Sequence, residues 1–264
     1  MDLGFVHAKQ NNHLIRSHDG FDSYLLITDA KTRYLWIFLC KNKKTPTKTV
    51  KLFLDQHGQT QGPRIIRTDQ GGELAKSKLM QDTIAAAGYS LEITGSDNSS
   101  QNGTVERPHR TLANMMRAAL TNSGIGEKYW SDALIHSVFI KNRLPHAAFK
   151  YKSTPYTELT GTKPNMDSLK IFGSPITTRE PGRRPVKLDN HCYNGIFLRF
   201  AKTLKNIVYI DKLTKKIKTT SYATFDEARY SANKKPRGAQ RLLQTGLPSP
   251  EPPEQMQSQK TPAI

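Results

Sequence analysis

The stretch Tyr24-Leu-Leu-Ile-Thr-Asp-Ala-Lys-Thr-Arg-Tyr-Leu-Trp-Ile-Phe-Leu-Cys40 sets the fold class of this 264-residue chain. Its two apolar runs flank the polar residues Ala30-Lys-Thr-Arg33, a pattern that predicts a β-hairpin. Asp29 is interpreted as a turn residue of this hairpin. Asp2–Ala8 has the pattern of another strand, so the chain is expected to begin with three strands.

Helices and strands alternate after the hairpin. Thr45 is expected to cap a helix with Pro46 at its first position, because Val50, Phe53 and Leu54 recur at helical spacing. The elements expected next are a strand at 64–69, a helix at 73–87, a strand at 89–94, a polar loop at 95–103 and a helix at 104–121. Together they predict an α/β sandwich over residues 1–123.

The pattern changes in the second half of the chain. An apolar stripe from Glu127 to Leu144, followed by Pro145, predicts a helix within a helical extension at 124–168. A small all-β barrel or sheet is predicted over 169–230 from short β-like runs at 196–200, 206–210, 216–219 and 223–225. Residues 231–264 are predicted to be a disordered Pro-rich tail, since they hold six of the 15 prolines and few apolar residues.

The composition favours a polyanionic partner such as nucleic acid. Lys+Arg 40 against Asp+Glu 22 gives a net charge of +18 and a pI near 9.9. Residues 1–123 hold 16 basic against 11 acidic residues (+5), and residues 124–230 hold 19 against 9 (+10), so the second block is the expected DNA-tracking surface. Surface lysines that only maintain solubility are the alternative.

Several other classes of protein are not expected. No stretch approaches the roughly 20 apolar residues of a membrane span, and the first residues lack the apolar block of a secretory signal. We therefore expect an intracellular chain that is not secreted and has no membrane partner. Cys40 and Cys192 lie far apart and outside any closely spaced set of Cys and His, so both are interpreted as packing residues.

Three carboxylates are candidates for one site. Asp69 ends a predicted strand before Gly71 and Gly72, at the edge where open α/β folds build their sites. Glu106 lies in the first turns of a predicted helix, and Asp2 lies on the first predicted strand. Three such acids can hold two divalent cations, about 3.5 to 4 Å apart, for in-line attack at phosphorus, and all-oxygen ligands suit magnesium. Taken singly, each acid has a simpler role as a turn cap, a helix-terminus residue or a solvated terminal residue.

The sequence motifs around these acids resemble those of a known family. Arg67-Thr-Asp-Gln-Gly-Gly-Glu73 and Gln101-Asn-Gly-Thr-Val-Glu-Arg-Pro-His-Arg-Thr-Leu112 resemble the second and third catalytic motifs of integrases from copia-type retrotransposons, and Asp2-Leu-Gly-Phe5 resembles the first. The 36 residues between the second and third acids are similar to the family's separation. The resemblance covers roughly Met1 to Tyr230 and continues through Lys128-Tyr-Trp-Ser-Asp-Ala-Leu134, Lys141-Asn-Arg-Leu-Pro145, Thr154-Pro-Tyr156 and Leu169-Lys-Ile-Phe-Gly173.

This resemblance implies a ribonuclease H-like mixed sheet flanked by helices, followed by a small Src-homology-type β-barrel at Asn190–Glu227. Asp2, Asp69 and Glu106 would be both the catalytic residues and the metal ligands of a DDE enzyme. With two Mg²⁺ or Mn²⁺ ions, it would carry out DNA 3'-end processing and strand transfer. The implied partners are the element's DNA ends, the target duplex and further copies of the chain in a homo-oligomer. The implied location is the nucleus at the point of action, and otherwise a cytoplasmic particle.

Five residues near the expected helix start are candidates for binding nucleic acid. Gln101 and Asn102 are placed on the loop that enters the helix, while Arg107, His109 and Arg110 follow Glu106. Their side chains could hold a phosphate or a base. The alternative is that they are solvated residues at the start of a helix.

The chain also departs from the family pattern. In the family, more of the first strand and a zinc-binding His/Cys segment precede the first Asp, whereas only Met1 stands before Asp2. Pro108 is expected near a helix start, which places that start near Asn102 or Thr104. Two alternatives stay open: a catalytically inactive, truncated DNA-binding remnant of an integrase, and a plain ribonuclease H-like nuclease.

Overall fold

A computed structural model describes residues 1–7, 13–41, 46–57, 64–69, 73–94, 99–179, 192–201 and 205–232. Met1–Glu227 form one compact unit and Ala228–Ile264 a second, of which only 228–232 are described. Most of the predicted Pro-rich tail and the predicted cap residue Thr45 therefore lie outside the described residues. Among the described helices, none is both long and apolar enough to cross a bilayer.

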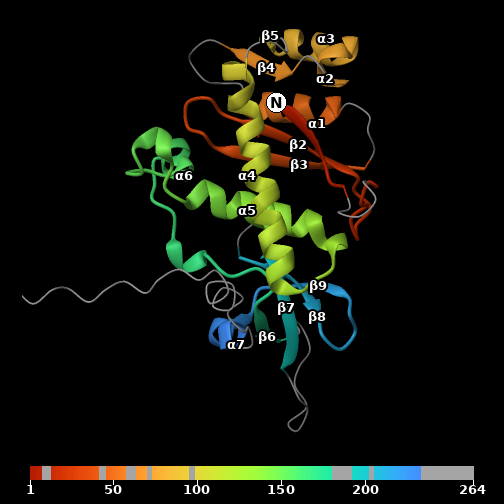
Figure 1. Cartoon of the computed structure of the whole chain (residues 1–264), viewed down its shortest axis with the longest axis vertical. Helices are drawn as coiled ribbons and strands as arrows, with labels where there is room; N and C mark the ends of the chain where they lie inside the picture. Colours follow the sequence, from red (N-terminus) through yellow and green to blue (C-terminus); the bar gives the residue numbers. More distant parts are fainter. Residues whose placement is uncertain are drawn as a thin grey trace, which may run out of the picture. The chain divides into compact units, whose positions relative to one another are not determined.

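The predicted hairpin and first strand are confirmed. β1 (Asp2–Phe5), β2 (Ser23–Thr28) and β3 (Leu35–Cys40) form an antiparallel sheet in the order β1-β2-β3 (Figure 1). Asp29 is the predicted turn residue, because its Oδ2 accepts hydrogen bonds from the backbone N–H and the hydroxyl of Thr32 at 2.7 and 2.6 Å. This bonding holds the connection between β2 and β3 in a tight turn.

A second, parallel pair of strands lies beside β1. β4 (Ile65–Asp69) pairs with β5 (Ser90–Thr94), and Asp69 is opposite Thr94. The amino group of Met1 donates a hydrogen bond to the carbonyl oxygen of Arg67 at 2.6 Å. The start of β1 is therefore in contact with β4, although these two strands do not form a continuous ladder.

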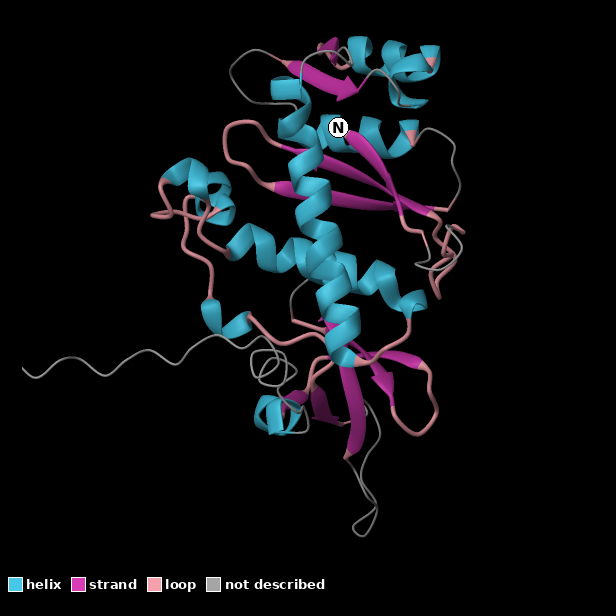
Figure 2. Ribbon diagram, viewed as in Figure 1, coloured by secondary structure: helices cyan, strands magenta, loops and turns pink. Residues whose placement is uncertain are grey.

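Helices cover both faces of β2, whose side chains alternate between the faces as a pleated strand requires (Figure 2). Leu25 and Ile27 pack with Val50, Phe53 and Leu54 of α1 (Thr47–His57) and with residues of α3 (Lys78–Ala86). On the other face, Tyr24 and Leu26 pack with α4 (Ser99–Ser123) and α5 (Trp130–Arg143). The predicted α/β architecture is confirmed at this level: a mixed arrangement of strands with helices on two sides.

Two predicted helices differ in detail from the structure. The helix predicted at 73–87 is divided into α2 (Glu73–Lys76) and α3, because the Ser77 hydroxyl accepts a hydrogen bond from the Met80 N–H and starts a new helix. The predicted start of α4 near Asn102 or Thr104 is wrong, because the helix begins at Ser99 and contains Pro108. A proline inside a helix costs roughly 3 kcal/mol, which burial of residues farther along α4, including Leu112, can offset.

The second half of the unit holds an antiparallel sheet in the order β10-β6-β7-β8-β9. The predicted small barrel is not closed within the described residues; the five strands form an open sheet. Hydrogen bonds from Thr178 to the Thr220 hydroxyl and the Tyr222 carbonyl connect β6 with the turn between β9 and β10. These strands are β6 (Pro175–Thr178), β7 (Tyr193–Phe200), β8 (Ile207–Asp211), β9 (Ile217–Thr220) and β10 (Ala223–Phe225).

Short helices fill the connections. They are the single-turn helices η1 (Glu127–Tyr129), η2 (Ala147–Phe149) and η3 (Met166–Ser168), together with α6 (Pro155–Thr160) and α7 (Glu227–Ala232). One hydrophobic cluster runs from Leu112 of α4 through Trp130 of α5 to Leu198 of β7, so α4 and α5 share their core with the second sheet. The domain boundary predicted near 169 stays a prediction. Of the two cysteines, Cys40 is buried as predicted, but Cys192 is exposed and is not a packing residue.

A buried carboxylate on α5 connects three parts of this unit. Asp132, which is 1% exposed, lies 2.6 Å from Nε of Arg199 on β7 and 2.6 Å from Nε2 of His18. The neighbouring Trp130 donates from Nε1 to the Ile15 carbonyl at 2.8 Å. The start of α5 is therefore tied to the segment before β2 and to the second sheet.

The other end of α5 is tied to β3. The buried amide of Asn142 accepts a hydrogen bond from the Leu35 N–H and donates one to the Leu35 carbonyl, both at 2.9 Å. These two hydrogen bonds take the place of those that a neighbouring strand would form with the first residue of β3. It satisfies two backbone groups that burial would otherwise leave without partners.

We expect Asn142→Ala to lower the free energy of unfolding by about 2–4 kcal/mol, because it leaves both backbone groups of Leu35 buried and unpaired. Urea denaturation followed by circular dichroism measures this change. The matched control is Asn114→Ala on the exposed side of α4, which should change stability by less than about 0.5 kcal/mol. Equal effects of the two substitutions would contradict the role given to Asn142.

Candidate active site

Asp2 of β1 faces His109 of α4. Its Oδ2 lies 3.1 Å from Nε2 of His109, with the two side chains 23% and 17% exposed. The separation suits an ion pair, but the geometry at Nε2 does not meet that of a hydrogen bond, and this buried nitrogen has no hydrogen-bond partner. The carboxylate and the imidazole are therefore in close contact without a formed hydrogen bond. Within the described residues, Oδ1 of Asp2 accepts no hydrogen bond.

Tyr24 of β2 supports the same histidine from behind. Its hydroxyl lies 3.1 Å from Nδ1 of His109, and the two rings are stacked with centroids 5.5 Å apart. The ring of Tyr24 lies over Gly4, its partner in the β1–β2 register, and a Cβ at that glycine would overlap the ring. Gly4 in the Asp2-Leu-Gly-Phe5 motif therefore leaves the space through which Tyr24 reaches His109.

Burial shifts the titration of Tyr24. Its side chain is 5% exposed, and desolvation, with a further contribution from the negative charge of Asp2, raises the pKa of its phenol to about 12. The hydroxyl therefore stays protonated at neutral pH and can donate to Nδ1 of His109. Sequence reasoning missed Tyr24, because only the register between β1 and β2 shows that it lies opposite the glycine of the first motif.

The other two predicted acids are placed by their backbones, since their side chains lie outside the described residues. Asp69 is the last residue of β4, two residues after the carbonyl that Met1 contacts. Glu106 lies three residues before His109 in α4, on the same face of the helix. The structure thus brings the chain segments that carry Asp2, Asp69 and Glu106 to one edge of β1.

The five predicted nucleic-acid contacts differ in what can be said of them. Gln101 and Asn102 belong to α4 and not to a preceding loop, and their side chains lie outside the described residues. Arg107 and Arg110 are exposed, whereas the ring of His109 lies in contact with Asp2 and Tyr24. Their predicted contacts with nucleic acid stay predictions.

The carboxylate of Asp2 suits a hard divalent cation. Asp2 offers an oxygen that no described residue engages, and Mg²⁺ prefers carboxylate oxygens together with water. Among the side chains that the structure describes, no three of His, Cys, Asp and Glu converge on one point. The side chains of Asp69 and Glu106 lie outside the described residues, so the predicted triad stays a prediction.

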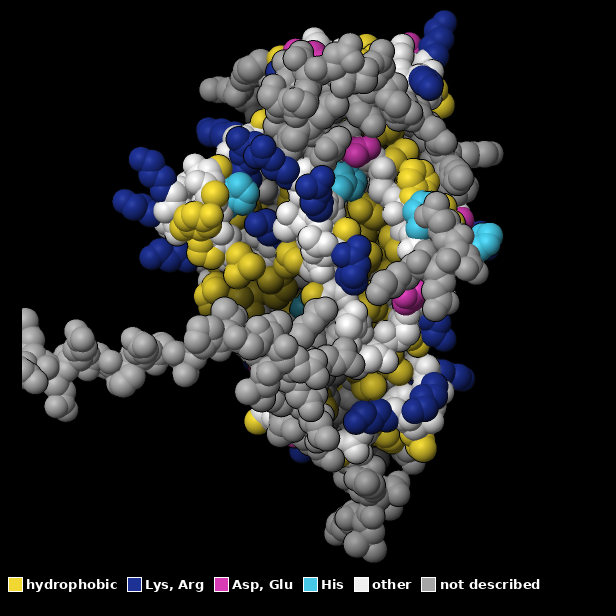
Figure 3. All heavy atoms as spheres, viewed as in Figure 1, with side chains coloured by type: hydrophobic (Ala, Val, Ile, Leu, Met, Phe, Trp, Pro, Cys, Tyr) yellow, Lys and Arg dark blue, Asp and Glu magenta, His cyan; other side chains and the backbone are white. Residues whose placement is uncertain are grey.

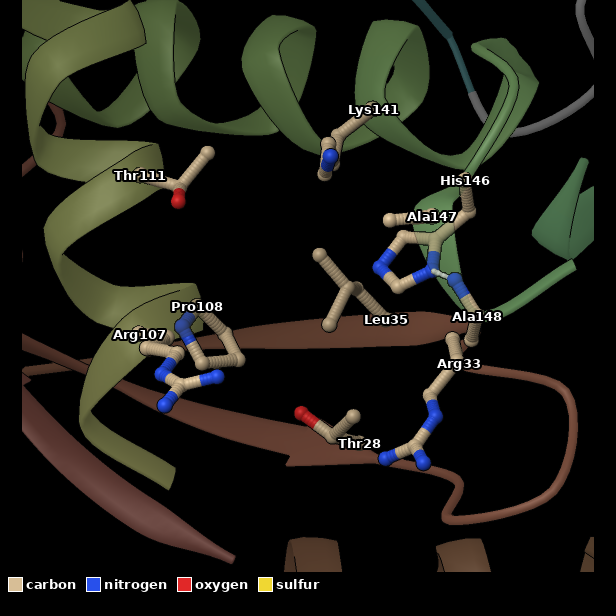
Figure 4. Close-up of a pocket in the computed structure, with 10 residues that line it drawn as sticks. All are labelled: Thr28, Arg33, Leu35, Arg107, Pro108, Thr111, Lys141, His146, Ala147 and Ala148. Atoms are coloured by element: carbon tan, nitrogen blue, oxygen red, sulfur yellow. Dashed lines mark hydrogen bonds between the residues drawn. The ribbon is translucent and has the colours of Figure 1, made fainter. Parts of the chain in front are cut away.

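A basic cleft lies beside this edge. It has a volume of about 450 Å³ and lies between the β2–β3 hairpin, α4, α5 and the turn after α5 (Figure 4). More widely, Lys and Arg side chains are spread over the face of the molecule in Figure 3, where acidic side chains are sparse. The residues that line the cleft are Thr28, Arg33, Leu35, Arg107, Pro108, Thr111, Lys141, His146, Ala147 and Ala148.

The chain is similar to retrotransposon polyproteins. It is 28% identical over 231 residues to the retrovirus-related Pol polyprotein from transposon RE1 of Arabidopsis thaliana, covering 85% of this chain and 15% of that polyprotein. The similarity to the Pol polyprotein from transposon TNT 1-94 of Nicotiana tabacum is 23% over 216 residues, 81% of this chain and 16% of the polyprotein. The Ty1-PR2 Gag-Pol polyprotein of Saccharomyces cerevisiae is 23% identical over 205 residues, 75% of this chain and 11% of its own length.

These similarities confirm the resemblance to copia-type retrotransposon polyproteins that the motifs predicted, and they extend to a Ty1 polyprotein. The chain spans less than a fifth of the length of the polyproteins that it matches. No family model matches it.

Tyr24 should make stability depend on pH in the alkaline range. Below pH 10 its phenol is protonated in both the folded and the unfolded chain. Between pH 10 and about 12 the unfolded phenol loses its proton while the folded one keeps it, so the folded state loses stability. From pH 9 to pH 11, we expect the free energy of unfolding of the unsubstituted chain to fall by about 1 kcal/mol more than that of Tyr24→Phe.

Chemical denaturation at the two pH values measures this difference. The control is Tyr151→Phe, because Tyr151 is 69% exposed and its loss should leave the pH dependence unchanged. The same pH dependence in the unsubstituted chain and Tyr24→Phe would show that the phenol titrates normally.

Proposed function

We propose that the chain is the integrase region of a copia-type retrotransposon polyprotein, and that it catalyses metal-dependent DNA 3'-end processing and strand transfer. One observation carries the proposal: at one edge of β1, Asp2 contacts the helix that carries Glu106, while Met1 contacts β4 just before Asp69. The three motifs that resemble integrase motifs are far apart in sequence, and this contact geometry supports their having a common site.

The strand arrangement supports a ribonuclease H-like core. The hydrogen bond from Met1 to the Arg67 carbonyl supports β1 and β4 as neighbours, so the order that we propose for the core is β3-β2-β1-β4-β5, with β1-β2-β3 and β4-β5 as its two hydrogen-bonded parts. In that order three antiparallel strands are followed by the parallel pair, with helices on both faces. On the same proposal, residues 1–123 are the catalytic core, 124–168 a helical extension and 169–230 the counterpart of the Src-homology-type module.

In this proposal Asp2, Asp69 and Glu106 hold the metal ions. Two Mg²⁺ or Mn²⁺ ions, when bound, activate the attacking oxygen and stabilise the leaving oxygen. His109 and Tyr24 fix the position of the Asp2 carboxylate, so that it does not have to be ordered when substrate arrives. The exposed guanidinium groups of Arg107 and Arg110, in the third motif, hold backbone phosphates of the DNA.

The same proposal names the partners and the location. The net charge of +18 supports binding to the element's DNA ends and to the target duplex. Joining two ends to one target needs more than one active site, which suits a homo-oligomer. Integration into chromosomal DNA takes place in the nucleus, and a cytoplasmic particle would carry the protein before that step.

Substitution of the acids tests the reaction. We expect Asp69→Asn and Glu106→Gln each to lower strand transfer by at least about 100-fold, because each removes a metal-binding carboxylate. A labelled donor end, a target duplex and either Mg²⁺ or Mn²⁺ provide the assay, in which joined products are separated by size. Asp55→Asn on the exposed side of α1 removes the same charge elsewhere and should retain full activity.

The products distinguish the alternatives. Metal-dependent hydrolysis without joined product would show a plain ribonuclease H-like nuclease instead of an integrase. Joining that persists in both acid variants would remove Asp69 and Glu106 from the mechanism.

DNA binding should not require the acids. In the absence of divalent metal we expect Asp69→Asn and Glu106→Gln to bind a duplex as tightly as the unsubstituted chain, or more tightly, since each removes a negative charge near the phosphates. Fluorescence anisotropy at several salt concentrations measures this, and affinity should fall steeply as salt rises. Salt-sensitive binding with no metal-dependent cleavage or joining by the unsubstituted chain would identify a DNA-binding remnant. Loss of binding in both variants would instead indicate that they are misfolded.

A further inference from the structure

The basic cleft beside the candidate active site is built from side chains that are far apart in the sequence. Arg33 comes from the turn between β2 and β3, Arg107 from α4, Lys141 from α5 and His146 from the segment after α5. Figure 4 shows these side chains arranged around one space, with Leu35 at its floor. The folded chain therefore brings four basic groups to one cavity.

Among the side chains that the structure describes, no acidic one lines this cleft. Among the described residues, none of Arg33, Arg107 and Lys141 forms an ion pair with a carboxylate. Like charges held around a confined space repel one another, and a low-dielectric wall strengthens that repulsion. An anion in the cleft would remove this cost, so the cleft favours a negatively charged occupant.

His146 is oriented as a hydrogen-bond donor to the same space. Its Nδ1 accepts a hydrogen bond from the Ala148 N–H at 3.1 Å, which leaves the proton of the neutral ring on Nε2. Figure 4 shows that second nitrogen turned toward the cleft. Burial lowers the pKa of His146, and the positive charges of Lys141 and Arg33 lower it further, as expected for a ring close to both.

The size and the wall of the cleft fit more than a simple ion. Its volume of about 450 Å³ lies within the roughly 300–1,000 Å³ of pockets that hold organic ligands. Leu35, Pro108 and Ala147 supply an apolar wall, which a sugar or a base can contact while a phosphate meets the basic groups. Arg107 directly follows Glu106 in α4, so the cleft and the candidate active site are formed in part by neighbouring residues of one helix.

We infer that this cleft binds a backbone phosphate and the adjoining sugar of a DNA strand, at a position away from the phosphate that reacts. The inference rests on the proposed function, because it assumes that the polyanion at this surface is DNA. Lys141, Arg33 and His146 contact the phosphate, and the apolar wall contacts the sugar. The cleft acts by positioning the strand, since none of these residues is at the reacting atoms.

A coupling experiment tests this contact. A series of duplexes is prepared in which one phosphate at a time is replaced by an uncharged methylphosphonate, and binding is measured without divalent metal. At one position we expect the neutral linkage to weaken DNA binding by the unsubstituted chain by about 5- to 10-fold. The same linkage should have little effect on DNA binding by the Lys141→Gln variant, which lacks the charge that the phosphate would meet. Arg33→Gln, from a different element, should lose sensitivity at the same position.

The matched control is Lys152→Gln, which removes an exposed lysine that does not line the cleft. This variant should keep the full sensitivity to the neutral linkage. If the neutral linkage, at every position, weakens DNA binding by Lys141→Gln and Arg33→Gln as much as it weakens binding by the unsubstituted chain, the inference is overturned. Circular dichroism confirms that the variants are folded before binding is compared.

Inorganic phosphate provides the arm that separates DNA from a free anion. If phosphate raises the melting temperature of the unsubstituted chain but not that of Lys141→Gln, while no DNA position shows coupling, the cleft is a small-anion site and the inference fails. The test is also independent of catalysis. If the effect of the neutral linkage at one DNA position is lost in the cleft variants, but the unsubstituted chain neither cleaves nor joins DNA, the inference about the cleft is supported and the proposed reaction is rejected. If the chain is active in strand transfer but no position shows this coupling, only the inference about the cleft is rejected.

Discussion

The arrangement of the described unit depends on the contacts of the buried Asp132 carboxylate with Arg199 and His18. A buried charge is tolerated only when partners compensate for its lost hydration, and Arg199 and His18 do so from two different segments. Removal of either partner would leave a charge in a site with almost no access to water. The position of α5 relative to β7 and to the segment before β2 is therefore set by electrostatics as well as by the apolar core around Trp130.

Because α5 is held in this way, it can position groups at its other end. Lys141 enters the basic cleft, and the next residue, Asn142, holds the start of β3. The same helix packs against α4, which carries His109. The candidate active site and the cleft are thus two parts of one framework, in which a single helix contacts both the sheet and the helix of the third motif.

Much of the framework could be predicted from local patterns. The hairpin around Asp29 is predicted correctly because two apolar runs and the polar turn between them are properties of adjacent residues. The start of α4 was predicted wrongly, because the rule that proline favours a helix start does not weigh the burial gained farther along the helix. The break at Ser77 was also missed, since its neighbours all favour helix and only the cap bond to Met80 divides them.

The contacts at the candidate site depend on information that no local pattern contains. Tyr24 and His109 are 85 residues apart, and they meet only because of the β1–β2 register and the packing of α4 on the sheet. Motif resemblance identified Asp2, but it could not show which side chains fix its carboxylate. The interface between the second sheet and α5 was missed for the same reason, because Arg199 and Asp132 are joined only in the folded chain.

The bond between Asn142 and Leu35 has a consequence for association between molecules. β3 is the outer strand of its sheet, and an outer strand with free backbone groups is a template onto which a strand of another molecule can add. The amide of Asn142 occupies the donor and the acceptor at the start of that strand, and α5 lies against it. A side chain thereby does what a further strand would do, and this end of the sheet is protected from intermolecular extension and from the aggregation that follows it.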